Sequence, residues 1–196
     1  MESEGVVMAE IDPTDMMGYH DRISSKLLNN HIYFLNGLID DYSSQEVIKW
    51  ILYENTIKEE NKVLTLYINS DGGDLTNAFA IVDIMRQSNY KIKTIGIGSI
   101  ISAGFLIFAC GEKGMRIISR NTSIMIHQYS AGILGKQHDL EAQYKELSLV
   151  KDRLVTTFRE VTGLKDDVIK NKLMPPSDVW MTPEELLKYN VADIIV

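Results

Sequence analysis

Apolar residues in this chain gather in short continuous runs, and segments of helical period lie between the runs. The runs are rich in Ile, Val, Leu and Tyr, as buried strands are. They cover residues 31–37, 62–70, 91–98, 114–119 and 122–128. Between the runs, apolar residues recur at helical spacing over 75–86, and a helix is expected to open at Ser43, which has capping-box spacing to Glu46. The alternation predicts an α/β fold with a mainly parallel sheet flanked by helices.

A longer amphipathic pattern covers residues 139–162, directly after the glycine-punctuated segment "AGILGKQ". A helix of this length would extend about 36 Å, more than a compact domain of this size usually needs. Two interpretations stay open. The helix either lies across its own domain or projects and buries its apolar stripe against another subunit. The stripe consists of Leu140, Tyr144, Leu147, Leu154 and Phe158.

Two serines interrupt the apolar stretch "GIGSIISAGFLIFACG" at residues 96–111. Ser102 stands where the strand turns into a short apolar helix, and that position alone favours a helix cap. Ser99 is ambiguous in the same way and lies nearer the strand. A second turn, "NSDGGD" at 69–74, also follows a strand. Because parallel strands bring their carboxyl ends to one edge of a sheet, both turns are expected at the edge where ligands bind.

His127 lies in the apolar run "IMIHQ", where Val or Ile would be usual. A core histidine is commonly structural. Serine, however, needs a neighbouring base to act as a nucleophile, and neutral imidazole suits that task. Glycines allow close approach of another group, and their amides could join the amide after Ser102 in an oxyanion hole. We therefore expect Ser102, His127 and the glycine turn to meet.

Composition narrows the class of protein. The chain has 196 residues, 45% of them hydrophobic, and a net charge of −7, which argues against nucleic acid as the main partner. The single cysteine, Cys110, excludes an internal disulfide and lies in an apolar run that favours an inert thiol. No apolar run reaches the roughly 20 residues of a membrane span, and signal-peptide features are missing. We expect a cytoplasmic protein without a membrane partner, with residues 1–20 as a mobile arm before a single domain at 21–196.

Several longer segments resemble motifs of the ClpP family, the self-compartmentalised serine peptidases. They are "YINSDGGDLTNAFAIVDIM", "GIGSIISAGFLIFACGEKGMR", "SIMIHQYSAGILGKQHDLE" and "WMTPEELLKYNVADII". The resemblance covers roughly residues 20–196, and the interval from Ser102 to His127 fits the family pattern without gaps. It implies a ClpP/crotonase-like fold with a protruding handle, a strand followed by the long helix, at about 128–162.

The resemblance also implies a site. Ser102 would be the nucleophile and His127 the general base, and the amides of Gly73 and Ala103 would form the oxyanion hole. Peptide bonds would be hydrolysed through an acyl-enzyme, without metal or cofactor. Residues Gly132, Ile133 and Leu134 would hold the substrate as an added strand.

The same resemblance implies an assembly. Seven subunits would form a ring, and two rings would meet through their handles as a tetradecamer that encloses a chamber. An AAA+ unfoldase of the Clp type would feed unfolded polypeptides into it. A related ClpP subunit is a further possible partner.

Two departures from the family pattern concern the site. The family's "SPGG" reads "SDGG" here, so Asp71 brings a charge close to the expected oxyanion hole. The ungapped position of the triad acid holds Lys172, and the nearest downstream carboxylate is Asp178, our candidate for the acid. Losing the orientation of the histidine can cost about 10⁴ in kcat. A catalytically impaired ring subunit, with a structural or regulatory role, therefore stands beside the peptidase hypothesis. A crotonase-type acyl-CoA enzyme is a third alternative.

Overall fold

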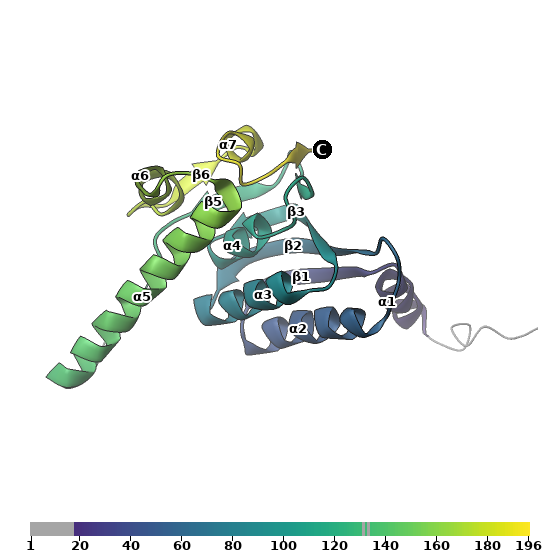
Figure 1. The fold of residues 1–196 in the computed structure, drawn as a ribbon, viewed down its shortest axis with the longest axis horizontal. Helices are drawn as coiled ribbons and strands as arrows, with labels where there is room; N and C mark the ends of the chain where they lie inside the picture. The colour runs from purple at the N-terminus through teal and green to yellow at the C-terminus, as the bar shows by residue number, and fades with distance from the viewer. Residues whose placement is uncertain (1–17, 131, 133) are drawn as a thin grey trace, which may run out of the picture.

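The computed structural model describes residues 18–130, 132 and 134–196, and Figure 1 shows their arrangement. In these residues seven strands form one sheet with the order β1-β2-β3-β4-β7, while β5 pairs with β3 and β6 pairs with β5. Every pairing is parallel except that of β5 with β6, so the prediction of a mainly parallel sheet is confirmed. The strands are β1 (Ile32–Ile39), β2 (Val63–Gly73), β3 (Lys91–Ile101), β4 (Arg116–Ile118), β5 (Ser123–Ile126), β6 (Val179–Met181) and β7 (Ile194–Ile195).

Helices flank this sheet. They are α1 (Tyr19–Asn29), α2 (Asp41–Thr56), α3 (Leu75–Gln87), α4 (Ala103–Ala109), α5 (Gln137–Thr162), α6 (Asp166–Val168), the π-helical turn η2 (Ile169–Leu173) and α7 (Pro183–Lys188). Helices α2, α3 and α4 lie side by side in one layer against β1, β2 and β3 (Figure 1). None of the helices in the described part of the chain is long and apolar enough to cross a membrane.

The start of α2 differs from the sequence prediction. The helix is capped by Asp40, whose carboxylate accepts the Ser43 N–H at 2.8 Å, while the Ser43 hydroxyl accepts the Asp40 N–H at 3.0 Å. Ser43 is therefore the third residue of the helix and not its cap, and the expected capping box with Glu46 is wrong. Asp40 stands where β1 ends, so the chain turns into the helix directly from the strand.

The core surrounds α4, all seven residues of which are buried. Phe105 of this helix meets Phe158 of α5 edge to face, with ring centroids 6.1 Å apart. Beneath the helix, β2 contributes the fully buried side chains of Leu64, Leu66 and Ile68. A helix enclosed in this way holds the residue at its N-terminus in a fixed position, because displacing it would disturb packed apolar side chains.

The two halves of α5 differ in exposure: one half lies across its own domain and the other half projects from it, while burial of the stripe against another subunit stays a prediction. Toward its C-terminus, Leu154, Val155 and Phe158 are buried in the core. Its N-terminal half projects away from the rest of the molecule (Figure 1), and Tyr144 there is 70% exposed. The handle strand expected before the helix is absent from residues 127–130, 132 and 134–136. These described residues have no neighbouring strand to pair with among the strands that the structure describes, and an isolated strand is not stable in water.

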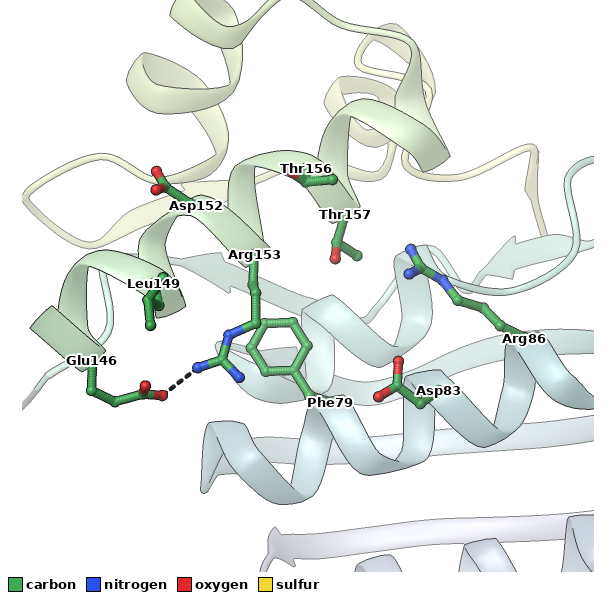
Figure 2. Close-up of a pocket in the computed structure, with 9 residues that line it drawn as sticks. All are labelled: Phe79, Asp83, Arg86, Glu146, Leu149, Asp152, Arg153, Thr156 and Thr157. Carbon is green, nitrogen blue, oxygen red and sulfur yellow. Dashed lines mark hydrogen bonds and ion pairs between the residues drawn. The ribbon is translucent and has the colours of Figure 1, made fainter.

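Side chains from α3 and α5 hold the two helices together on the outer side of the domain (Figure 2). The Arg153 guanidinium lies 5.6 Å from the centre of the Phe79 ring and also pairs with Glu146. Arg86 of α3 pairs with Glu160 of α5 at 2.7 Å. Because these ion pairs are exposed, each contributes little, and the buried face of α5 supplies most of the attachment.

An ion pair fixes the C-terminal strand to the sheet. The Arg116 side chain is only 1% exposed, and it donates two hydrogen bonds, of 2.7 and 2.8 Å, to the carboxylate of Asp193. Burial raises the pKa of Asp193, but the hydrogen bonds and charge of Arg116 outweigh burial and hold that pKa below its usual value. This stabilising contribution is present at neutral pH and is lost as the pH falls through the depressed pKa.

The substitution Asp193→Asn leaves a buried guanidinium without its counter-charge. We expect it to lower the free energy of unfolding by about 3 kcal/mol at pH 7, measured by urea denaturation. The matched control is Asp166→Asn, which removes an ion pair of equal length, 2.7 Å, between Asp166 and Arg159 on the surface. A similar loss in both variants would contradict a special role for the buried pair.

Candidate active site

Ser102 connects β3 to α4 in a strained conformation. Its backbone has φ 54° and ψ −117°, an unusual combination for a residue other than glycine, and its N–H donates to the Met125 carbonyl at 3.0 Å. Its side chain makes no capping hydrogen bond to α4. The structure therefore does not support the helix-cap interpretation. A sharp strand-to-helix turn of this kind presents a serine hydroxyl at the edge of the sheet.

His127 lies beside this hydroxyl, with its Nε2 atom 2.9 Å from the Ser102 Oγ atom. Sheet register explains the contact across 25 residues of sequence. Strand β5 runs parallel to β3 with Met125 opposite Ile101, so Ser102 and His127 both emerge just past the carboxyl ends of paired strands. The expectation that these two residues meet agrees with the geometry.

Asp178 approaches the other side of the imidazole, with its Oδ1 atom 3.3 Å from His127 Nδ1. Strand β6 pairs antiparallel with β5 and sets Val179 opposite Ile126, so Asp178 comes to lie near His127. The Asp178 side chain is 62% exposed, against 26% for His127. Lys172, at the ungapped position of the family's acid, is an exposed residue of η2.

The glycine turn at the end of β2 packs directly against Ser102. A Cβ atom on Gly72, which has φ 97°, would lie 2.9 Å from both Ser102 Cβ and the Ile101 carbonyl oxygen. Gly73 has φ 149°, and a Cβ there would lie 2.2 Å from the Ile39 carbonyl oxygen. Ala103 is the first residue of α4, so its N–H has no acceptor within the helix. Amides of the turn and of the helix start therefore come close to the serine.

Ser99, the second serine of the apolar stretch, has a different partner. Its hydroxyl donates to the Asp71 carboxylate at 2.6 Å, and its N–H donates to the Asn69 side chain at 3.0 Å. Asp71 is exposed and held in place by this bond. The pairing was not predicted. Both residues lie near the carboxyl ends of β2 and β3, which pair in the parallel sheet, and this shared edge is the only sequence signal that could have indicated the contact.

A cavity of about 430 Å³ opens beside the serine and the histidine. One wall is apolar and includes Leu75, Ile101, Met125 and Tyr129. Burial raises the pKa of Tyr129, whose hydroxyl donates to the Leu147 carbonyl at 2.5 Å. This bond ties the segment after β5 to α5, so one side of the cavity is formed by the long helix.

The residues expected to hold substrate lie in the segment between β5 and α5. Leu134 is 92% exposed, and the space around Gly132 is open. Ile133 lies outside the described residues. Residues 1–17 of the N-terminal arm expected at 1–20 also lie outside them, and the last two residues of that arm, Tyr19 and His20, belong to α1. Both described positions are accessible to a ligand strand.

Cys110, at the C-terminal end of α4, does not compete with Ser102 as a nucleophile. Burial raises the pKa of its thiol to about 12. At neutral pH almost all of the thiol is therefore protonated, and the protonated form is a poor nucleophile. The prediction of an inert thiol agrees with this environment.

Known proteins share these features of sequence and fold. The family model for Clp protease matches residues 16–196. The chain is also 32% identical over 196 residues to the ATP-dependent Clp protease proteolytic subunit of Deinococcus radiodurans, a match that covers 100% of this chain and 95% of that protein. The fold agrees with that of the family. The chain therefore belongs to the Clp protease family of peptidases.

Proposed function

We propose that this chain is a serine endopeptidase that hydrolyses peptide bonds of unfolded polypeptides. The observation that carries the proposal is the row of contacts from the Ser102 hydroxyl to His127 at 2.9 Å and from His127 to Asp178 at 3.3 Å. A serine in a strained turn, bonded to an imidazole that faces a carboxylate on its other nitrogen, is the arrangement that acyl transfer needs.

In this mechanism the Ser102 oxygen attacks the carbonyl carbon of the peptide bond while its proton passes to His127 Nε2. The imidazolium then gives that proton to the leaving amine, the C–N bond breaks, and an ester to Ser102 remains. Water attacks the ester carbonyl while one of its protons passes to His127 Nε2. The bond between the carbonyl carbon and Ser102 Oγ then breaks, the imidazolium returns its proton to Oγ, and the product leaves as a carboxylic acid that ionises in water. Asp178 accepts the Nδ1–H of His127 throughout, which leaves Nε2 free to take the proton.

Negative charge on the carbonyl oxygen is stabilised by the amides of Gly73 and Ala103. Glycine at position 72 supports this role, because a side chain there would collide with Ser102. The segment that contains Gly132, Ile133 and Leu134 pairs with the substrate as an added strand and holds the scissile bond over Ser102.

A catalytically impaired ring subunit is the second candidate. The observation in its favour is the 62% exposure of Asp178, since water weakens the hold of an exposed carboxylate on the imidazole. Such a subunit would keep the fold and bind peptide or a related subunit without rapid turnover. Membership of the Clp protease family favours both of these candidates over the third alternative, a crotonase-type acyl-CoA enzyme.

For the assembly we propose heptameric rings that stack in pairs as a cytoplasmic tetradecamer, in which each chain contributes one domain at 21–196. The projecting half of α5 supports this, because Leu140 and Tyr144 are exposed on one face there without a covering element among the described residues. A second ring would bury these side chains. An AAA+ unfoldase of the Clp type delivers the unfolded substrate, and a related ClpP subunit can complete a mixed ring.

Covalent labelling tests the proposed nucleophile. A fluorophosphonate probe should label the wild-type protein, and intact-mass spectrometry should place one adduct on Ser102. Ser102→Ala and His127→Ala should stay unlabelled, because one lacks the oxygen and the other lacks the base. Intact rings of wild type that resist the probe would favour the impaired subunit.

The role of Asp178 can be measured separately. We expect Asp178→Asn to lower kcat for a fluorogenic peptide by between about tenfold and 10⁴-fold, because the amide no longer fixes the imidazole tautomer. Asp167→Asn, on the exposed surface of α6, is the matched control and should keep the wild-type rate. Equal rates for both variants would exclude Asp178 as the orienting acid.

The ring contact can be tested on the projecting half of α5. Leu140→Asp together with Tyr144→Asp should split double rings into single rings in sedimentation velocity while leaving the melting temperature of the subunit close to wild type. Leu154→Asp, in the buried half, should instead lower the melting temperature, because it places a charge in the core. An unchanged sedimentation coefficient for the double variant would contradict the proposed interface.

A further inference from the structure

The cavity beside Ser102 combines an apolar wall with an acidic rim. Leu75, Ile101 and Met125 supply apolar surface, and Asp71 and Asp74 are its acidic residues. No lysine or arginine belongs to its lining in the described part of the chain. A ligand side chain with an apolar stem and a cationic end matches this distribution, because the stem covers the wall while the charge stays at the rim.

Asp71 and Ser102 both belong to the lining of this cavity. Asp71 precedes Gly72, the glycine that packs against Ser102. The bond from Ser99 uses Oδ1 of Asp71, which fixes the side chain and leaves Oδ2 for a ligand. Asp74 is less available, because its Oδ1 atom caps α3 by accepting the Asn77 N–H at 2.8 Å.

A fixed carboxylate at this position has an electrostatic consequence for catalysis. Its negative charge opposes the negative charge that develops on the carbonyl oxygen of the substrate. A cationic substrate side chain beside Asp71 neutralises the carboxylate and removes this repulsion. A substrate with a neutral or acidic side chain leaves the repulsion in place or increases it.

We infer that Asp71 is a specificity-determining residue that selects polypeptides carrying Lys or Arg next to the scissile bond. This inference rests on the proposed peptidase function, and it names the substrate class for that site. Ser99 is a positioning residue that acts through Asp71.

Two sets of measurements test the inference. The first compares quenched-fluorescence peptides that differ only by Lys, Gln or Glu at one position flanking the scissile bond. For one such position, wild-type kcat/KM should favour Lys over Gln by about five- to tenfold. The ratio should fall to about one in Asp71→Asn and persist in Asp71→Glu. Asp83→Asn, whose carboxylate lies at the separate cavity between α3 and α5, should keep the wild-type ratio (Figure 2).

The second set measures binding without turnover, by fluorescence anisotropy of the same peptides with Ser102→Ala and with Ser102→Ala/Asp71→Asn. Tighter binding of the Lys peptide that requires Asp71 supports the inference. If that binding preference is found but no peptide is cleaved by wild type, the peptidase proposal fails, and only the assignment of Asp71 as the residue that binds the cationic side chain stands. Cleavage that shows no preference for Lys, or a preference that survives Asp71→Asn, overturns the inference and leaves the peptidase proposal intact. Failure of both cleavage and binding overturns both.

Discussion

The pairing of β5 on both of its edges is the constraint on which the candidate site depends. On one edge, the parallel register with β3 brings His127 to Ser102, and on the other edge the antiparallel register with β6 brings Asp178 to His127. A slip of one residue in either pairing would turn the side chains to the opposite face of the sheet and separate the three groups. The site therefore follows from backbone hydrogen bonds more than from attraction between its side chains.

The strain at Ser102 depends on the packing around it. A non-glycine residue at φ 54° costs free energy, which the neighbouring structure must offset. The helix that follows is entirely buried, and the glycine turn of β2 occupies the space on its other side. Apolar burial thus fixes the Ser102 hydroxyl in the orientation that the proposed nucleophilic attack requires, and this links the core to the proposed chemistry.

Much of the fold and part of the site could be predicted from the sequence. Apolar runs locate buried strands because a parallel sheet is covered on both faces, and the ends of such strands share an edge, which indicated that Ser102, His127 and the glycines gather there. The sequence alone does not single out Asp178, because its place depends on the register of β6 with β5, a pairing between segments far apart in sequence. The cap of α2 was misplaced because two residues able to cap, Asp40 and Ser43, stand three positions apart. The Asp71–Ser99 bond joins two strand ends, and no local pattern encodes such a contact.

The most direct test is a crystal structure of the protein treated with a peptide boronate. We expect a tetrahedral boron bonded to Ser102 Oγ. One boron-bound oxygen should accept hydrogen bonds from the amides of Gly73 and Ala103, and another should lie near His127. Unreacted serines in every subunit, with the imidazole of His127 turned away from the hydroxyl, would contradict it.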